Sequence, residues 1–358
     1  MRREFWEGKR VFLTGHTGFK GSWLSTWLQD AGTIVTGFSL LPNTQPNLFD
    51  SSNVSDQMES VIADIRNFGE LSKAMKDSSP EIVIHMAAQP IVRESYDDPL
   101  ATYSTNVLGT ANLLQAVRQT PSIKAVINVT TDKCYENKER LAGYREDDEM
   151  GGHDPYSSSK GCSELVTASF RRSFFFHDNS ANIATARAGN VIGGGDWARD
   201  RLVPDVLRTL QTGGKIDLRN PDSTRPWQHV LEPLSGYLTL AEKLYEGDQS
   251  YASAWNFGPE EEGVQPVRVI VEYLLEKLGD GATWEHTNTE QPHEAKLLKL
   301  DISKAKKDLG WRPRWDLYRT LDAVVSWHQG WLGKKNVKSL MLNQIIEFES
   351  TQTSNNGR

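Results

Sequence analysis

The chain has 358 residues, of which 38% are hydrophobic and 24% are charged. This length and composition suit a folded protein with one large domain or two closely joined domains, and they argue against a fibrous or disordered chain. The formal net charge is −7. We therefore expect no nucleic-acid partner, because proteins that bind nucleic acid carry a concentrated basic face.

The two cysteines, Cys134 and Cys162, do not form a C-x-x-C motif, so we expect reduced thiols and no disulfide framework. The first residues, "MRREFWEGKRVF", are charged and contain no secretory hydrophobic region. No segment approaches the run of about 20 apolar residues that a membrane span needs. These features predict a cytoplasmic protein without a membrane partner.

Strands and helices alternate along the first half of the chain. Apolar, β-branched runs predict strands at 10–15, 33–40, 60–65, 81–88, 124–130 and 182–191. Apolar residues at helical spacing predict helices at 22–32, 68–77, 103–120 and 157–175. This alternation is typical of an α/β fold with a Rossmann-type, doubly wound parallel sheet, in which helices connect the strands.

The pattern loosens after residue 190. We expect residues 1–190 to form a dinucleotide-binding domain that carries the catalytic residues. Residues 191–335 are expected to form mainly a smaller, mixed α/β substrate lobe that closes over the strand ends, with elements that can cross between the two. Residues 336–358 are expected to form a C-terminal helix and a polar tail, "FESTQTSNNGR", with a disordered end.

A glycine-rich loop follows the first predicted strand. The motif T-G-x-x-G-x-x-G spans Thr14 to Gly21 and leads directly into a predicted helix. In that setting Gly15 allows a tight turn, Gly18 admits a pyrophosphate close to the backbone, and Gly21 lets the helix pack on the strand. G-K-[ST] is absent, which excludes a Walker-type loop. The motif predicts a bound dinucleotide, and a glycine turn without a ligand is the alternative.

The second predicted strand ends at Ser39, where dinucleotide-binding folds usually offer Asp or Glu to the adenosine ribose. A hydroxyl makes one neutral hydrogen bond, whereas a carboxylate makes charge-assisted bonds that are about twice as strong. We therefore expect NAD to be held weakly, with NADP as the alternative cofactor.

A tyrosine and a lysine stand four residues apart in "DPYSSSKG", at the start of a predicted helix. Tyr156 and Lys160 therefore lie on one face of that helix. An ammonium group beside a phenol stabilises the phenolate, so we predict a lowered pKa for Tyr156 and a role as a base. The strand "VINVTTDKCY" ends in Thr131, Asp132 and Lys133, and strand ends meet at the ligand crevice of an open α/β sheet.

Several long motifs, in this order, resemble those of the nucleotide-sugar 4,6-dehydratases, a group of extended short-chain dehydrogenases/reductases. The resemblance covers roughly residues 8 to 330 and is carried by "GHTGFKGSWL", "HMAAQPIVRESY", "TYSTNVLGT", "TTDKCYEN", "RAGNVIGGGDWARDRLVPD" and "RPWQHVLEPLSGYL". It implies a lyase that uses NAD, in deoxysugar biosynthesis such as that of an O-antigen. Within the group, these motifs favour CDP-glucose as the substrate.

The resemblance implies a role for each residue at the strand end. In this family a phenolate removes the C4 hydroxyl proton while hydride passes from C4 to NAD, and Tyr156 matches that base, with Lys160 beside it. A second base then removes the C5 proton, an acid protonates the departing C6 hydroxyl, and hydride returns to C6. Members that act on dTDP-glucose carry T-D-E, whereas this chain has Lys133 in place of Glu. We expect a neutral Lys133 as the C5 base and a protonated Asp132, its pKa raised by burial, as the acid. Thr131 is expected to bond the C4 oxygen.

The resemblance also implies residues that contact the cofactor and the nucleotide sugar. The cofactor residues are Gly15, His16, Thr17, Gly18, Phe19, Lys20, Gly21, Ser39, Asp64, Ile65, Ala87, Ala88, Asn106, Tyr156 and Lys160. The substrate residues are Gln89, Arg93, Asn190, Arg201, Arg219, Arg225, Asn256 and His293. The planar guanidinium groups suit phosphate oxygens. The dispersed histidines show no zinc-site spacing, so we predict no metal.

Three alternatives stay open from the sequence. The first is a 4,6-dehydratase that acts on UDP-N-acetylglucosamine or dTDP-glucose. The second is a 4-epimerase, which needs Tyr156 and Lys160 but no C5 acid and base. The third is an NAD-binding regulator without chemistry. The segments "YSTNVLGTANLLQAV" and "SSSKGCSELVTASF" resemble the helix pair of the family's four-helix dimer interface, so we expect a homodimer or a dimer of dimers.

Overall fold

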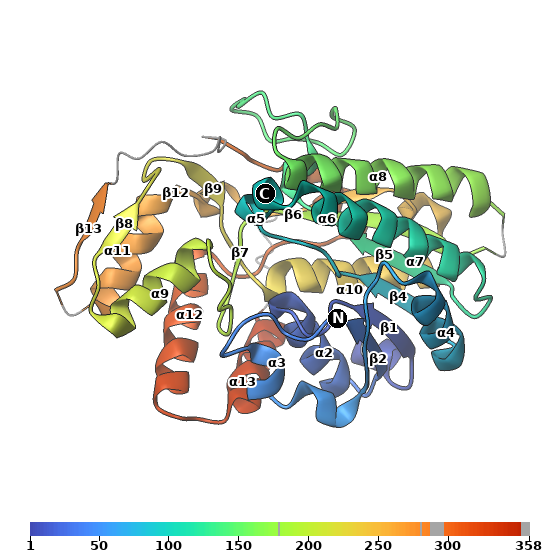
Figure 1. The fold of residues 1–358 in the computed structure, drawn as a ribbon, viewed down its shortest axis with the longest axis horizontal. Coiled ribbons are helices and arrows are strands. Elements are labelled where there is room, and N and C mark those ends of the chain that lie inside the picture. Colours follow the sequence, from blue (N-terminus) through green and yellow to red (C-terminus); the bar gives the residue numbers. More distant parts are fainter. Residues whose placement is uncertain (178–179, 280, 287–296, 352–358) are drawn as a thin grey trace.

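A computed structural model describes residues 1–177, 180–279, 281–286 and 297–351. Its centre is a seven-stranded sheet with the strand order β11-β6-β5-β4-β1-β2-β3 (Figure 1). Every neighbouring pair in it is parallel, which confirms the predicted doubly wound sheet. The strands are β1 (Arg10–Thr14), β2 (Ile34–Ser39), β3 (Glu59–Ile62), β4 (Ile82–His85), β5 (Ala125–Val129), β6 (Asn182–Ala188) and β11 (Ala254–Phe257).

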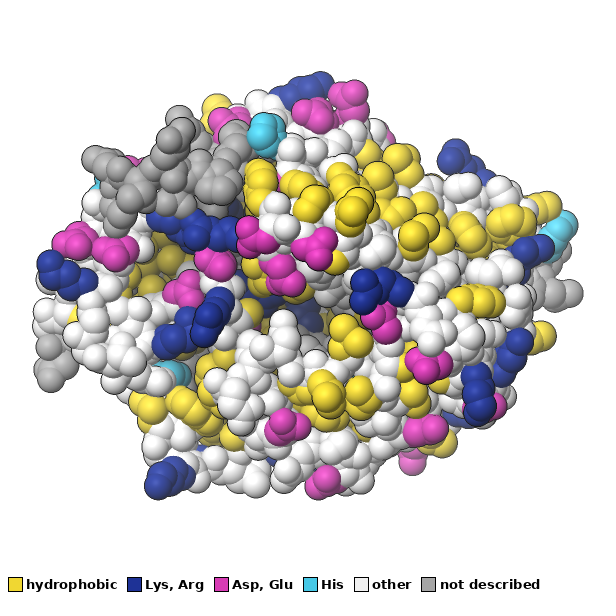
Figure 2. Space-filling view, in the orientation of Figure 1, with side chains coloured by type: hydrophobic (Ala, Val, Ile, Leu, Met, Phe, Trp, Pro, Cys, Tyr) yellow, Lys and Arg dark blue, Asp and Glu magenta, His cyan; other side chains and the backbone are white. Residues whose placement is uncertain are grey.

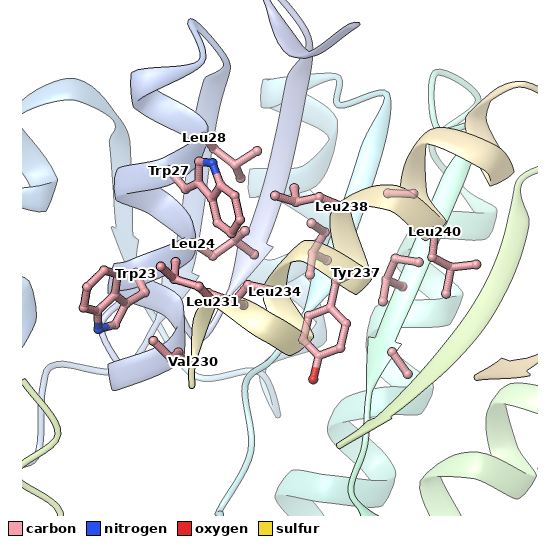
Figure 3. Close-up of a cluster of buried hydrophobic side chains, with 14 of the residues drawn as sticks. Trp23, Leu24, Trp27, Leu28, Val230, Leu231, Leu234, Tyr237, Leu238 and Leu240 are labelled. Atoms are coloured by element: carbon pink, nitrogen blue, oxygen red, sulfur yellow. The ribbon is translucent and has the colours of Figure 1, made fainter. Parts of the chain in front are cut away.

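One face of the sheet is covered by α2 (Phe19–Asp30) and α10 (Leu231–Tyr245), with α13 (Val337–Ser350) packed behind α2. Side chains alternate between the two faces of a strand, so Val11 and Leu13 of β1 join this cluster. Burial of each large apolar side chain here contributes about 1.5–3 kcal/mol. Figure 3 shows the contact between the helices, which is formed by Trp23, Leu24, Trp27, Leu28, Val230, Leu231, Leu234 and Leu238.

The opposite face packs against α4 (Phe68–Ser78), α7 (Gly109–Arg118) and α8 (Pro155–Phe174). Phe12 of β1 points to this side. The helix predicted at 103–120 is the end of a longer helical run, α6 (Pro99–Tyr103), η2 (Ser104–Leu108) and α7, in which η2 is a single π-helical turn.

A smaller lobe lies at the left of Figure 1 and has its own hydrophobic cluster. Its main helices are α9 (Leu202–Thr212), α11 (Val267–Leu278) and α12 (Leu317–Leu332). Three two-stranded sheets accompany them: β7 (Val191–Ile192) with β10 (Gln228–His229), β9 (Thr224–Pro226) with β12 (Val264–Pro266), and β8 (Ile216–Leu218) with β13 (Trp284–His286).

Short elements connect these parts. They are α1 (Arg3–Trp6), α3 (Leu48–Ser51), η1 (Val54–Gln57), α5 (Val92–Asp97), η3 (Asp132–Cys134), η4 (Gln249–Tyr251), η5 (Glu261–Gly263) and η6 (Ala305–Leu309). Among the described residues, no helix is both long enough and apolar enough to span a bilayer.

The chain crosses between the two parts more than once. Strand β11 and helix α10 come after residue 190, yet β11 pairs with β6 at the edge of the central sheet and α10 packs on that sheet. The division expected at residue 190 allowed elements to cross between the two parts, and β11 and α10 are such elements. Helix α13 lies in the segment expected to hold a C-terminal helix, and the expected disorder of the final residues concerns positions outside the described ones.

Candidate active site

A cavity of about 1280 Å³ lies at the carboxyl ends of the central strands, between the sheet and the smaller lobe. Figure 2 shows Lys and Arg side chains next to Asp and Glu side chains around a hollow on this face. The following predicted site residues line the cavity: Gly15, Thr17, Gly18, Phe19, Lys20, Gly21, Ser39, Asp64, Ile65, Ala87, Ala88, Arg93, Thr131, Asp132, Lys133, Tyr156, Lys160, Asn190, Arg201, Arg219 and Arg225.

The glycine loop has the geometry of a phosphate cradle. Gly15 has φ +76°, and a Cβ there would lie 2.8 Å from the backbone nitrogen of Ala87. A Cβ at Gly21 would lie 2.0 Å from the carbonyl oxygen of Gly15. Helix α2 begins after Gly18 without a side-chain cap, so its first N–H groups face the cavity. These residues fit the pyrophosphate of a dinucleotide.

Two side chains at the expected adenosine end of the cradle, Ser39 and Asp64, already have partners within the protein. The hydroxyls of Thr17 and Ser39 lie 2.9 Å apart, and Thr17 also donates to the carbonyl of Leu40 at 2.8 Å. A ribose hydroxyl bound at this strand end would share Ser39 with Thr17. Asp64 is paired with Arg66 at 2.6 Å, and this hydrogen bond holds the pKa of Asp64 below its usual value.

Four predicted contact residues lie behind the cavity wall rather than on it. His16 is buried, with Nε2 2.7 Å from the Ser60 hydroxyl, and burial lowers its pKa to about 4. The Asn106 side chain brackets Gln89, accepting from its N–H at 2.9 Å and donating to its carbonyl at 3.0 Å. Asn256 donates to the carbonyls of Tyr144 and Asp301. These side chains support the loops around the cavity, and His293 lies outside the described residues.

The residues after β5 form η3, a single 3-10 turn at the cavity floor. Thr131 caps this turn and donates to Asp132 Oδ1 at 3.0 Å. Asp132 Oδ2 is buried and has no hydrogen-bond partner in the described part of the chain. A Cβ on Gly189 would lie 2.6 Å from that oxygen. Burial raises the pKa of Asp132, against Lys133 and the Thr131 hydrogen bond, which confirms the prediction of a raised value.

Helix α8 presents Tyr156 and Lys160 to the same cavity. Asp154 caps the helix by accepting from the Ser157 N–H at 2.9 Å. Burial raises the pKa of Tyr156 to about 12, although a hydrogen bond with Thr131 lowers it. The predicted lowering of this pKa is therefore wrong for this structure. The Lys160 ammonium donates to the Val129 carbonyl at 3.2 Å, and burial lowers its own pKa to about 8.

Arginines from the smaller lobe line the opposite end. Arg201 pairs with Asp196 at 2.9 Å. Arg225 is buried and donates to the Thr224 carbonyl. Nη1 of Arg219 is buried and has no partner among the described residues. This positive wall suits a diphosphate.

An ion pair joins the two sides of the cavity. Arg93 of α5 lies 3.3 Å from Asp200, which belongs to the loop before α9. Both residues line the cavity, so this pair connects the sheet domain to the smaller lobe at the site.

Sequence reasoning assigned no role to several other lining residues. Asp196 and Trp197 follow three glycines in "GGGDWARDR", and Trp197 packs against Trp327 and Trp331 of α12 at centroid distances of 5.7 and 5.5 Å. The sequence did contain a signal for these residues, because the glycine-rich segment "GGGDWARDR" directly follows β7. In the described ranges, no group of three His, Cys, Asp or Glu side chains could hold a metal ion.

Comparison with known proteins defines the family. A sequence model described as GDP-mannose 4,6-dehydratase matches residues 12–324, most of the chain. The chain belongs to the GDP-mannose 4,6-dehydratase family. A family relative, the CDP-glucose 4,6-dehydratase of Salmonella typhimurium, is 51% identical over 98% of this chain and 99% of that protein. The dTDP-glucose 4,6-dehydratase of Shigella flexneri is 24% identical over 94% and 98% of the two chains.

Solved structures of this family and its neighbours share the fold. The dTDP-glucose 4,6-dehydratase of Bacillus anthracis, solved in complex with NAD, has a TM-score of 0.77 at 21% identity and covers 93% of this chain and 100% of its own. The UDP-glucose 4-epimerase of Thermotoga maritima, solved with UDP-glucose, has a TM-score of 0.79 at 21% identity and covers 90% and 99%. Dehydratases and epimerases thus share this backbone, so the fold alone does not distinguish the two reactions.

Proposed function

We propose that this protein converts CDP-glucose to CDP-4-keto-6-deoxyglucose and water, with NAD as a cofactor that is restored in each turnover. The observation that carries the proposal is the 51% identity, over 98% of the chain, to a CDP-glucose 4,6-dehydratase. The cavity supports it, because Asp132, Lys133, Tyr156 and Lys160 line one space together with the glycine loop.

The cofactor is proposed to lie along the glycine loop. When bound, NAD supplies reversible hydride acceptance, which makes a transient oxidation of the sugar possible. The N–H groups at the start of α2 hold its pyrophosphate, Ser39 and Asp64 lie at its adenosine end, and Lys160 lies at its nicotinamide ribose. The solved relatives with NAD support this choice of cofactor.

Tyr156 is the proposed base at the C4 hydroxyl. Its pKa of about 12 in this structure means that the phenol holds its proton at neutral pH, so proton removal from the sugar depends on charges that stabilise the phenolate. The Thr131 hydrogen bond and the positive charge of Arg201 both act in that direction. Thr131 also lies where it can share a hydrogen bond with the C4 oxygen.

The next residues carry the elimination. A C4 ketone acidifies the C5 hydrogen, Lys133 accepts that proton, and Asp132 donates a proton to the departing C6 hydroxyl. Burial raises the pKa of Asp132 and so favours its protonated form, and its buried Oδ2 has no hydrogen-bond partner among the described residues. A 4-epimerase needs only the first step, so Asp132 and Lys133 favour the dehydratase.

The sugar diphosphate is proposed to lie against the arginines of the smaller lobe. Arg225 and Arg219 face the diphosphate, and Arg201 flanks it from the start of α9. Asn190 lies just after the end of β6 and lines the same cavity, where it is proposed to contact the sugar nucleotide. We keep His293 as a proposed substrate contact from the sequence alone.

We also propose a homodimer that forms through the α6–α8 face. Hydrophobic side chains gather over these helices in Figure 2. Leu100, Leu108 and Leu165 are 80%, 61% and 59% exposed, which is unusual for leucines that lie on adjacent helices. Sedimentation should give twice the chain mass for the wild type, and Leu108→Glu should shift it toward the mass of one chain.

A substrate panel tests the function. The protein is incubated with NAD and with CDP-, dTDP-, GDP- or UDP-glucose, and the 4-keto-6-deoxy product is followed by its absorbance in alkali. We expect turnover of CDP-glucose well above the others. No turnover of the CDP sugar contradicts the proposal, and efficient turnover of another sugar assigns a different nucleotide.

A further inference from the structure

We propose that Glu164 and Arg187 act as a positioning pair that fixes both ends of the segment Thr131–Lys133 and thereby sets the geometry of the elimination step. This inference rests on the proposed function for its catalytic meaning. Neither residue lines the cavity, so both act through their neighbours.

Glu164 is buried on α8, one helical turn after Lys160, and its carboxylate accepts four hydrogen bonds. Oε1 accepts from the Thr130 hydroxyl at 2.5 Å and from Arg187 Nε at 2.8 Å. Oε2 accepts from the Thr185 hydroxyl at 2.7 Å and from Arg187 Nη2 at 2.9 Å. Burial opposes ionisation, but Arg187 and the hydroxyls hold the pKa of Glu164 below its usual value. Thr130 immediately precedes the catalytic segment.

Arg187 carries the connection to the other end of that segment. From buried strand β6 its Nη1 donates to the Tyr135 hydroxyl at 2.6 Å. Tyr135 donates in turn to Asn256 Oδ1 at 2.7 Å on β11. The guanidinium also lies over the Tyr135 ring, 4.9 Å from its centroid. One ion pair therefore holds residue 130 and residue 135, on either side of η3.

The segment between these anchors is weakly held from within. The Lys133 N–H lies 3.4 Å from the Thr131 hydroxyl oxygen, and the Cys134 N–H lies 3.4 Å from the Thr131 carbonyl. Both distances are beyond the usual range for a backbone donor. Such a turn depends on its flanks for a fixed position. Backbone bonds of 2.9 Å hold the flanks at the Ala186 carbonyl and the Gly151 N–H, and the side-chain anchors lead to Glu164 and Arg187.

The positions of the catalytic side chains predict that loss of this pair slows the elimination more than the C4 oxidation. Tyr156 and Lys160 stand on the long helix α8, whereas Asp132 and Lys133 stand on η3. Loosening η3 should therefore slow removal of the C5 proton more than C4 oxidation, which depends on this segment only through Thr131. A misplacement of about 1 Å can slow a reaction by about 10²-fold.

Matched hydroxyl deletions test this. Tyr135→Phe removes the hydroxyl that accepts from Arg187. Tyr144→Phe is its control, because the Tyr144 ring stacks on Tyr135 but its hydroxyl bonds to the Lys138 N–H and not to Arg187. Thr130→Val removes one hydroxyl from Glu164 at the segment, and Thr185→Val removes another that is not attached to the segment. Single-turnover cofactor reduction reports C4 oxidation, and exchange of the C5 hydrogen with deuterated water reports the elimination half.

We expect Tyr135→Phe and Thr130→Val to slow C5 exchange by roughly 10- to 100-fold and cofactor reduction by a clearly smaller factor, so that reduced cofactor accumulates. Tyr144→Phe and Thr185→Val should not separate the two rates. Equal slowing of both halves, no slowing, or the same separation in the controls overturns the proposal.

Amide hydrogen exchange of the peptide that spans residues 130–135 reads the positioning directly and needs no turnover. It should rise in Tyr135→Phe and Thr130→Val and stay unchanged in the two controls. A wild type that does not act on CDP-glucose contradicts the proposed function, and the amide exchange then still decides between a positioning pair and an ordinary buried ion pair.

Discussion

Asp132 shows at the scale of one residue how burial creates an acid. Its Oδ2 lacks a partner in the described part of the chain, and Gly189 leaves no room for a Cβ beside it. A charged carboxylate without a second partner is disfavoured in such a place, so its pKa rises. The same site raises the pKa of Tyr156 to about 12. Burial thus suits Asp132 to its proposed role as an acid, and it means that Tyr156 would act as a base only beside groups that stabilise the phenolate.

Asp132→Asn should separate the two halves of the reaction. The amide cannot protonate the departing C6 hydroxyl, so product formation should fall by roughly 10²- to 10⁴-fold, while cofactor reduction by the substrate continues. Rapid-mixing measurements of reduced cofactor and of product check this. Equal loss of both signals would assign Asp132 to binding or folding instead.

Ser39 sets the expected strength of cofactor binding. Ser39→Asp replaces a hydroxyl shared with Thr17 by a carboxylate, and a charge-assisted bond to the ribose should add about 1 kcal/mol, or roughly fivefold in the NAD Kd. NADP should bind more weakly to this variant because the carboxylate repels its 2′-phosphate. Titration calorimetry checks both values, with Ser39→Ala as the control. Unchanged NAD binding in Ser39→Asp would place the ribose away from this strand end.

Sequence reasoning reached these residues because strand ends meet at one edge of the sheet, but it could not assign the direction of each side chain. His16 and Asn106 belong to the same motifs as lining residues, yet both side chains turn into the protein. The pKa of Tyr156 was predicted with the wrong sign, because spacing on a helix reveals Lys160 but not the burial of the phenol. Arg187 is a charged residue within the predicted strand "NIATARA", which indicates a buried ion pair, but no role was predicted for it.

At the scale of elements, α10 ties distant segments together through a buried acid. Glu232 lies in the first turn of α10, and its Oε1 accepts from the N–H groups of Arg314 and Trp315 at 2.9 and 2.7 Å. Its Oε2 has no partner in the ranges described. Burial raises the pKa of Glu232 to about 8.

Glu232→Gln should change the pH dependence of stability. The folded protein keeps this proton up to a pH of about 8, while the unfolded chain loses it near its ordinary pKa of 4.5. The contribution of the protonated acid is therefore fully present below the lower value and declines as the pH rises toward the upper one. The glutamine variant should gain stability relative to the wild type by up to about 1.4 kcal/mol per pH unit within that window.

Urea unfolding of both proteins across this pH window measures the difference. A Glu232→Gln difference that is constant with pH would show that Glu232 titrates normally in the folded state.

Element prediction succeeded where patterns were strong. The six strands predicted in the first half are β-branched runs of four to seven residues, and each is found. Strand β11, in "SAWNFG", has four residues with an asparagine among them, and its place beside β6 depends on pairing across some 70 residues of chain. Helix α6 begins at Pro99 with Asp98 as its cap, a start signal that the sequence did contain.

At the scale of the whole molecule, the cavity forms because later segments of the chain pack on the central sheet and hold the smaller lobe against it. The smaller lobe supplies Arg201, Arg219 and Arg225, while the sheet domain supplies the glycine loop and the catalytic segment. Elements α10, β11 and α13 then anchor the later chain to the sheet. A net charge of −7 is compatible with the proposed binding of two diphosphates, because Arg and Lys side chains are concentrated in the lining of the cavity.

The fate of the C4 hydrogen tests the central claim most directly. CDP-glucose labelled with deuterium at C4 is incubated with the protein and NAD in ordinary water, and the product is examined by nuclear magnetic resonance and mass spectrometry. The account predicts CDP-4-keto-6-deoxyglucose with the deuterium at C6, transferred within one turnover. Deuterium that returns to C4 of a sugar still carrying its C6 hydroxyl, or a product without the label, would contradict it.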